Sequence, residues 1–302
     1  NLMKALEGII PVLITPLNKK LDLDIQSLKK IINYISFYNP CAFWANGTGS
    51  EDMSLSLNKR ITLTKKICDF NKKNIPIISG CSFHSFDETF EFLNKTKNFD
   101  ISGYHYLPYN NMISLSNLDL LYKDIAKYAS KPVWLYTSAN WYKYISPNFI
   151  DNLKRIKNIA GVKYSTSNIV DMQLVQSLAD TRFQVISAVV KTLYSCLSLG
   201  VKASTTVEAF TYPKLINKIR NSFIDGDLKN SYLLQKKLNY LVNKMPQISA
   251  KNNFLKVAEI KYLLSKKKLC KKFVCRPYRP VENKTEKKLL DNFYKKYFDD
   301  LF

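Results

Sequence analysis

Short apolar runs alternate with longer amphipathic segments along the chain up to about residue 207. Eight of these runs are rich in β-branched or aromatic residues, a composition that predicts β-strands. The expected strands cover residues 9–14, 41–45, 75–79, 101–106, 132–136, 159–163, 183–187 and 201–206. Their apolar positions are continuous instead of alternating, which is typical of a parallel sheet covered by helices on its outer face.

The segments between the runs have apolar residues at helical spacing. One apolar stripe consists of Ile25, Leu28, Ile31, Ile32 and Ile35. A second consists of Leu118, Leu121, Tyr122 and Ile125. Ser116, at the second stripe, and Ser146 followed by Pro147 predict helix starts, because serine caps helices and proline is favoured at the first helical position.

Eight strands with helices between them predict an α/β protein with a (β/α)8 TIM barrel. A doubly wound open sheet is the alternative, but Thr15-Pro16-Leu17 stands where its glycine-rich phosphate turn would follow the first strand. After Thr206 the pattern is helical only, over residues 212–222, 228–242, 253–264 and 286–298. We therefore expect a barrel over residues 1–207 and, over residues 208–302, a C-terminal helical extension packed on it.

The chain is strongly basic, with 46 Lys and Arg against 24 Asp and Glu and a formal net charge of +22. Such an excess is able to attract the phosphates of a nucleic acid. Between residues 214 and 272, however, the basic residues alternate with apolar ones, as on the solvated faces of amphipathic helices. We therefore expect no nucleic-acid partner, and a charge that favours anionic small substrates.

The sequence gives no sign of export, of a membrane span or of a metal centre. The apolar stretch at residues 8–14 is too short to cross a bilayer, and no signal-peptide pattern is present. The six cysteines are scattered, as expected of a reduced, cytoplasmic protein. The two histidines, His84 and His105, are too few and too far apart to suggest a metal site, so we expect no metal.

Lys163 ends the sixth apolar run, where a lysine is unusual. Desolvation at such a position lowers the pKa of the amine and makes it a nucleophile that forms a Schiff base with a ketone; a strand-end lysine in solvent is the alternative. Two further candidates follow strands of the expected barrel. Tyr136 ends the fifth run, and a turn with Gly47, Thr48 and Gly49 follows the second. In such barrels the reactive residues lie at the carboxyl ends of the strands.

Five segments in this order resemble one enzyme family. They are residues 8–17 with a Thr-Pro turn, the Gly-Thr-Gly-Ser-Glu loop at 47–51, Leu135-Tyr136, Gly161-Val162-Lys163 and the Arg-Pro segment at 275–278. Together they are similar to the pyruvate-dependent class I aldolases, the family of dihydrodipicolinate synthase and N-acetylneuraminate lyase. The resemblance covers nearly the whole chain and implies a (β/α)8 barrel. It also implies a homo-oligomer, a tetramer or a dimer.

The resemblance implies roles for single residues. Lys163 would form the imine with pyruvate or a 2-keto acid, with no dissociable cofactor, and Tyr136 would transfer protons to and from the substrate hydroxyl. Thr48, with its own backbone N–H and that of Gly49, would hold the carboxylate. Ser165 would contact the aldehyde acceptor.

The chain also departs from the family's pattern. Gly49 replaces a second loop threonine, whose hydroxyl Ser50 would supply from the next position. Asn110 replaces the relay tyrosine, and an amide does not cycle a proton as a phenol does; Tyr109 is the neighbouring alternative. Trp141 replaces the arginine typical of dihydrodipicolinate synthases, which argues against lysine biosynthesis.

The family's pattern therefore does not identify the acceptor that this chain binds. Residues 188–191 lack the acidic pair of the sialic acid lyases, which argues against sialic acid. Lys191, Trp141 and Thr205 are candidates for a different, anionic acceptor. We expect a lyase or aldolase acting on a sugar-derived 2-keto-3-deoxy acid. A dehydratase using the same imine, or a weakened barrel with a binding or regulatory role, is the alternative.

Overall fold

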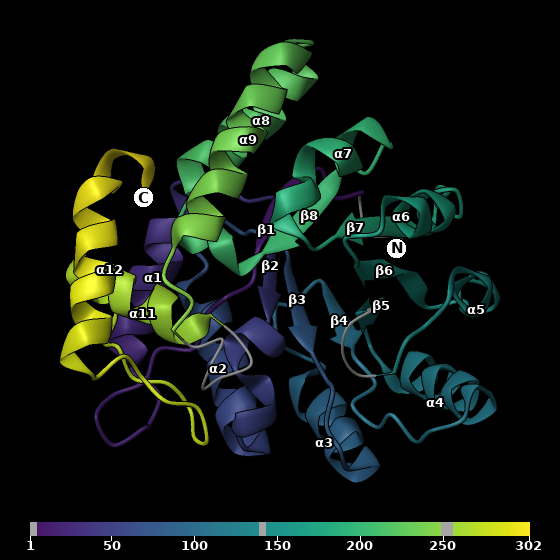
Figure 1. Ribbon diagram of the computed structural model, residues 1–302. Helices are drawn as coiled ribbons and strands as arrows, with labels where there is room; N and C mark the ends of the chain where they lie inside the picture. Colours follow the sequence, from purple (N-terminus) through teal and green to yellow (C-terminus); the bar gives the residue numbers. More distant parts are fainter. Residues whose placement is uncertain (1–4, 139–142, 249–255) are drawn as a thin grey trace.

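The computed structural model describes residues 5–138, 143–248 and 256–302. Its eight parallel strands follow one another in a single sheet in the order β1-β8-β7-β6-β5-β4-β3-β2 (Figure 1). The strands are β1 Gly8–Pro11, β2 Phe43–Ala45, β3 Ile77–Gly80, β4 Gly103–Tyr106, β5 Val133–Ser138, β6 Ile159–Ser165, β7 Gln184–Ser187 and β8 Ala203–Thr206. A bridge between Val12 and Trp44 joins the two ends of the sheet. The predicted (β/α)8 barrel is thereby confirmed.

Helices follow the strands and cover the outside of the barrel (Figure 1). They are α1 Ile25–Ser36, α2 Leu57–Phe70, α3 Phe86–Thr96, α4 Leu115–Tyr128, α5 Pro147–Leu153, α6 Ile169–Gln176, α7 Leu193–Ser198 and α8 Pro213–Ile224. The apolar stripe of α1 is buried against the sheet at Leu28, Ile31, Ile32 and Ile35. The stripe therefore explains how α1 is fixed on the barrel, since each buried aliphatic side chain contributes roughly 1.5–3 kcal/mol.

The predicted helix starts are right in one case and wrong in the other. Ser146 caps α5 by accepting a hydrogen bond from the backbone N–H of Phe149, with Pro147 at the first helical position. The start at Ser116 is wrong, because α4 begins two residues earlier. There Ser114 accepts the capping hydrogen bond from the N–H of Asn117 at 3.1 Å.

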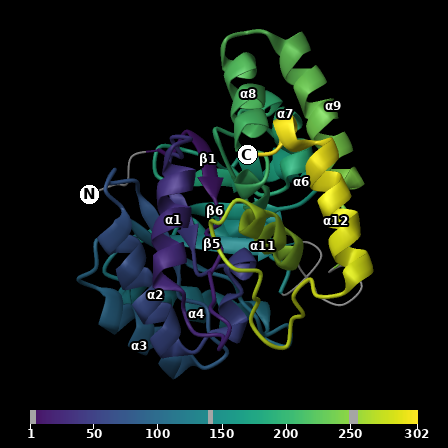
Figure 2. The ribbon, with the colours of Figure 1, turned by 90° about the vertical axis from the view of Figure 1, so that its left-hand side faces the viewer.

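Beyond α8 the chain remains helical, with α9 Leu228–Lys244, α11 Val257–Lys266 and α12 Lys284–Lys296. The helix expected over 253–264 is observed in part, since residues 253–255 lie outside the described ranges. The two ribbon views place α11 beside α1 and α12 on the barrel's flank (Figure 2). A domain boundary at residue 207 stays a prediction.

Large aromatic side chains fill the inside of the barrel. Trp44 on β2 stacks on His105 of β4 with ring centroids 4.1 Å apart. Trp134 of β5 lies against Gly161 on β6, where a Cβ atom would stand 2.3 Å from the indole and 2.2 Å from the carbonyl oxygen of Gln184. Only glycine fits there. Because Lys163 is two residues farther along the same face of β6, these rings form the floor beneath it.

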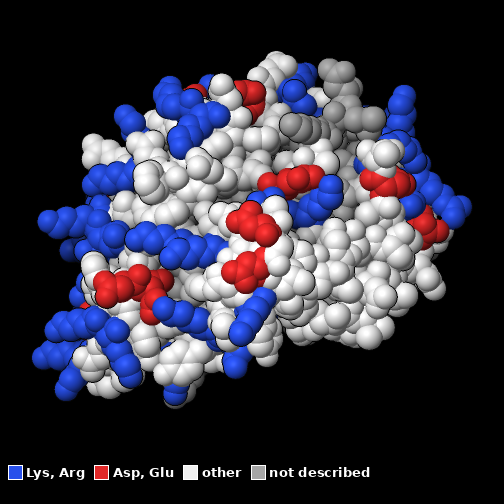
Figure 3. All heavy atoms as spheres, turned by 90° about the horizontal axis from the view of Figure 1, so that it is seen from above, with Lys and Arg blue, Asp and Glu red and all other residues white. Residues whose placement is uncertain are grey.

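The basic residues are spread over the helix surfaces. Seen from above, Lys and Arg side chains are interspersed with acidic and uncharged residues (Figure 3). Lys237 pairs with Asp300, and Lys266 pairs with Asp291. Among the helices of the described ranges, none has both the length and the apolar character required to span a bilayer.

Candidate active site

Lys163 and Tyr136 are direct neighbours on adjacent parallel strands, β6 and β5. The ammonium nitrogen of Lys163 lies 3.7 Å from the centroid of the Tyr136 ring. Both strands were predicted to end at these residues, which is wrong. The ladder continues through the pair Thr137 and Tyr164 to Ser138 and Ser165, because each strand supplies the other's backbone hydrogen bonds. The two side chains therefore project into the barrel from strands that extend two residues past them.

The Lys163 side chain is enclosed. Only 5% of the residue is exposed, and its nitrogen lies 5.3 Å from the centroid of the Trp44 ring, above the aromatic floor. Burial lowers the pKa of Lys163 to about 7, and the charge of Asp52 partly opposes this effect. A lysine with such a pKa is neutral in part at physiological pH and is able to act as a nucleophile.

This pKa predicts the pH dependence of imine formation. Only the neutral amine attacks a ketone, so the rate of adduct formation should rise as the pH increases through about 7 and then level off. The measurement is the yield of a borohydride-reduced pyruvate adduct after a fixed short time over a series of pH values. A rate that continues to rise toward the ordinary lysine value of 10.5 would contradict the burial of the amine.

Thr48 completes a group of three with these two residues. It begins the short 3₁₀ turn η1, Thr48–Ser50, after β2, and its hydroxyl oxygen lies 3.3 Å from that of Tyr136. Burial raises the pKa of the Tyr136 phenol, and the hydrogen bond with Thr48 opposes that rise. The phenol therefore stays protonated at neutral pH and has a hydroxyl neighbour with which to exchange a proton.

Gly49 and Ser50, the two loop residues that differ from the family's pattern, both contact other parts of the protein. A Cβ atom at Gly49 would lie 2.9 Å from a methyl carbon of Val12, so the loop packs tightly on β1. The Ser50 hydroxyl donates to the carbonyl oxygen of Leu13 at 2.5 Å and accepts from the N–H of Gly47 at 3.2 Å. Ser50 thus fixes the loop, and its contact with a substrate carboxylate stays a prediction.

Two other predicted residues stand on strands of the barrel. Ser165 is the last residue of β6 and is half-buried. Thr205 on β8 pairs with Ile10 of β1 and is fully buried, and its hydroxyl has no hydrogen-bond partner in the described part of the chain. A buried hydroxyl without a partner is costly, so Thr205 has an unused donor and acceptor for a ligand.

Two other predicted residues, Asn110 and Lys191, lie at the surface. Asn110 is exposed, and its side-chain oxygen accepts a hydrogen bond from the N–H of Met112 at 2.9 Å. Lys191 is also exposed and donates to Asn243 of α9 at 2.6 Å. Trp141 lies outside the described residues. The described structure thus brings together Lys163, Tyr136 and Thr48.

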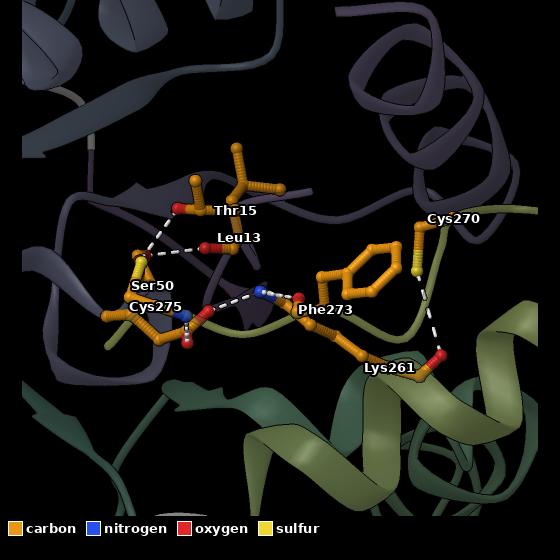
Figure 4. Close-up of polar contacts among 8 residues, drawn as sticks. Leu13, Thr15, Ser50, Lys261, Cys270, Phe273 and Cys275 are labelled. Carbon is orange, nitrogen blue, oxygen red and sulfur yellow. Dashed lines mark hydrogen bonds and ion pairs between the residues drawn. The ribbon is translucent and has the colours of Figure 1, made fainter. Parts of the chain in front are cut away.

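Glu51, directly after η1, forms a buried ion pair with Lys261 of α11, a contact that no pattern in the sequence predicted. The side chains of both are almost fully enclosed, at 1% and 0% exposed. Lys261 also donates to the carbonyl oxygen of Phe273 at 2.9 Å, and the N–H of Cys275 donates to Glu51 at 2.7 Å (Figure 4). The C-terminal helical region thereby holds the loop that carries Thr48.

Asp52 was also missed. It follows Glu51, is buried, and accepts a hydrogen bond from the phenol of Tyr109. Tyr109 is therefore buried beside the site, whereas its neighbour Asn110 points to the surface. The sequence offered one signal, a carboxylate directly after the Gly-Thr-Gly-Ser-Glu loop.

A pocket of about 1000 Å³ lies at the opposite end of the barrel. Residues at the amino ends of β5, β6 and β7, among them Pro132, Ala160 and Gln184, line it. Lys163, Tyr136 and Thr48 are not among its lining residues. In the described ranges, no group of three or more His, Cys, Asp or Glu side chains is arranged to hold a metal ion.

A lysine buried on β6 against a tyrosine of β5, inside a (β/α)8 barrel, has the features of a class I aldolase or lyase, an enzyme that works through a lysine imine. Comparison with known proteins places the chain in one family of such enzymes. The model of the dihydrodipicolinate synthetase family matches residues 5–295, and the chain belongs to this family.

Individual relatives support the assignment. A 4-hydroxy-tetrahydrodipicolinate synthase of Buchnera aphidicola subsp. Schizaphis graminum is 27% identical over 241 residues, which cover 77% of this chain and 80% of the relative. The E. coli K12 prophage protein YagE of the dihydrodipicolinic acid synthase family, solved in complex with pyruvate, has a TM-score of 0.87 at 18% identity and covers 96% of this chain and 98% of its own. N-acetylneuraminate lyase from Mycoplasma synoviae has a TM-score of 0.86 at 19% identity, covering 97% and 98%. The two structural likenesses concern the fold alone.

Proposed function

We propose that this protein is a Schiff-base lyase or aldolase that cleaves or forms a carbon–carbon bond in a sugar-derived 2-keto-3-deoxy acid. Pyruvate is the keto partner, and Lys163 is the amine that forms the imine. The observation that carries the proposal is the buried Lys163, with its lowered pKa and its nitrogen 3.7 Å from the Tyr136 ring. Such an amine has the reactivity that imine formation requires.

In the cleavage direction, the neutral nitrogen of Lys163 attacks the ketone carbon. The Tyr136 phenol donates its proton to the hydroxyl that leaves as water, which gives a cationic imine and a phenolate. The phenolate then takes the proton of the substrate's C4 hydroxyl. The C3–C4 bond then breaks, its electrons move into the imine to give an enamine, and an aldehyde leaves. Protonation of the enamine and hydrolysis of the imine release pyruvate and restore the amine.

The loop after β2 would orient the substrate. Thr48 and the backbone N–H groups of Thr48 and Gly49 are proposed to hold the substrate carboxylate, since donors in a tight turn suit an anion. Thr48 also lies next to Tyr136 at 3.3 Å, so one residue would connect carboxylate binding with proton transfer. Ser165 and Thr205 are proposed contacts of the acceptor.

The choice of substrate class rests on changed residues. By the family resemblance, dihydrodipicolinate synthases carry an arginine at the position where this chain has Trp141. An acidic pair is likewise missing at residues 188–191. The strong positive charge of the chain favours an anionic substrate.

A panel of substrates tests this proposal. The purified protein is incubated with 2-keto-3-deoxy acids of different chain length, and released pyruvate is measured over time. The same samples are assayed for loss of water without release of an aldehyde. Release of pyruvate with an equal amount of aldehyde supports the lyase. Formation of a dehydrated keto acid would instead identify a dehydratase, and no turnover of any member would contradict both.

Replacing Tyr136 by phenylalanine should lower turnover by about 10²–10⁴-fold, because the base that removes the hydroxyl proton is lost. The lysine imine should still form, since its amine is unchanged. The measurement compares pyruvate release with borohydride trapping in the same preparation. Tyr104→Phe is the matched control: its buried phenol lies 2.9 Å from the Thr96 hydroxyl, and its loss should leave turnover within a few-fold of normal. Equal losses in both variants would contradict a role for Tyr136 in proton transfer.

A further inference from the structure

Asp52 carries a carboxylate that the reaction described above does not use. It begins the turn η2, Asp52–Ser54, four residues after Thr48, and is only 1% exposed. In the described part of the chain, one of its two oxygens, Oδ1, has no side-chain hydrogen-bond partner. A buried carboxylate costs folding free energy unless it is paired, so its presence beside the site calls for a physical reason.

One residue from another element binds this carboxylate, and a second acts on it through its charge. The phenol of Tyr109, from the loop after β4, donates a hydrogen bond to Oδ2. The Arg60 guanidinium of α2 acts on Asp52 through its charge while it donates to the carbonyl oxygens of Gly80 at 2.7 Å and Ser82 at 2.5 Å. Burial raises the pKa of Asp52, whereas Arg60 and Tyr109 act in the opposite direction and favour the ionised form.

Asp52 continues the loop that contacts the reactive pair: the hydroxyl of Thr48, four residues earlier, lies 3.3 Å from that of Tyr136, and the centroid of the Tyr136 ring lies 3.7 Å from the Lys163 nitrogen. The charge of Asp52 acts electrostatically on Lys163, where it favours the charged form, and on Tyr136, where it favours the neutral phenol. The other titratable groups that interact electrostatically or by a hydrogen bond with Asp52 or Lys163 are Arg60, Tyr109, His105, Cys275 and Tyr278. Burial keeps His105 neutral, because its pKa lies well below the ordinary value. Among the described groups, Asp52 is the one whose charge favours the charged form of Lys163.

We propose that Asp52, held by the Tyr109 phenol, is the counter-charge for the cation that forms on Lys163 when the amine condenses with a ketone. The imine nitrogen is positively charged and, like the amine, enclosed by Trp44 and Tyr136. A carboxylate at this depth interacts with it far more strongly than it would in water. Asp52 is thus a positioning residue: it acts through Lys163 and Tyr136 and does not contact the substrate.

The inference rests on the proposed function for the imine, but its first test does not require a substrate. The pH dependence of Lys163 acetylation by a neutral reagent, followed by mass spectrometry of its peptide, reports the pKa of this amine directly. Asp52→Asn should shift the midpoint to lower pH by about one unit, since an opposing charge is removed. Tyr109→Phe should shift it in the same direction, because Asp52 then loses the donor that favours its ionised form.

The same variants are then examined with pyruvate. Asp52→Asn should reduce the amount of trapped adduct at equal pyruvate concentration by about tenfold, because the cationic imine loses its counter-charge. Tyr104→Phe, which removes a buried hydroxyl away from Asp52, should change neither the acetylation midpoint nor the adduct. If Asp52→Asn does not fold, the acetylation midpoint and the trapped adduct are measured in Tyr109→Phe instead.

An acetylation midpoint that is unchanged in a folded Asp52→Asn or Tyr109→Phe protein would overturn this role of Asp52. Failure of the wild-type protein to form any pyruvate adduct, together with the expected shift in midpoint, would overturn the proposed function instead and leave the electrostatic coupling established. The two outcomes are therefore distinguishable.

Discussion

Replacing Lys163 by methionine should abolish formation of the pyruvate adduct and reduce turnover by more than about 10⁴-fold, as expected when a covalent nucleophile is removed. Methionine has a similar length and fills the space between Trp44 and Tyr136, so the loss would reflect chemistry and not a cavity. The measurement is the rate of pyruvate release from the best substrate of the panel, with the adduct trapped in parallel.

The folded state should tolerate this change. The Lys163 ammonium is desolvated, as its pKa of about 7 indicates, so an apolar side chain removes an unfavourable burial. The melting temperature of Lys163→Met should therefore equal or exceed that of the wild type, as at other sites where function is maintained against stability. Retained turnover in this variant would show that another group forms the covalent intermediate.

Replacing Lys261 by methionine should lower the free energy of unfolding by about 3–5 kcal/mol, because Glu51 would remain buried without its partner. The pair is enclosed from solvent, and Glu51 also accepts the N–H of Cys275, so it cannot turn toward water without breaking that contact. Equilibrium unfolding in urea measures the change. Activity should fall as well, since Glu51 stands in the loop that carries Thr48.

Lys266→Met on the same helix is the matched control. Lys266 pairs with Asp291 at 2.7 Å, but both side chains are more than a third exposed, so this loss should cost no more than about 1 kcal/mol. The double variant Glu51→Leu with Lys261→Met should recover part of the stability, because no buried charge remains. Equal costs for Lys261→Met and Lys266→Met would contradict the assignment of Glu51 and Lys261 as a buried pair.

The architecture was predictable because each element bears a local pattern. The eight apolar runs correspond to the eight strands, and the stripe from Leu28 to Ile35 corresponds to the buried face of α1. The ends of strands were less predictable. β5 and β6 continue past Tyr136 and Lys163 because Ser138 and Ser165 pair with each other, and such pairing depends on the neighbouring strand and not on local composition.

The site was predictable only in part. Lys163, Tyr136 and Thr48 follow apolar runs, and the barrel brings the carboxyl ends of such strands together. Two pairings could not be foreseen. Glu51 and Lys261 are 210 residues apart and Asp52 and Tyr109 are 57 residues apart, so only the folded chain brings them into contact. In the sequence, Lys261 is one of two lysines of α11, two residues after Glu259, and nothing in this segment marks Glu51 as its partner.

The most direct test of the central claim is to incubate the protein with pyruvate, reduce it with borohydride, and locate the modification by peptide mass spectrometry. We expect one added group, a reduced pyruvate imine, on Lys163, and no such group in the Lys163→Met protein. An unmodified Lys163, or a modification spread over surface lysines to the same extent in both proteins, would contradict this expectation.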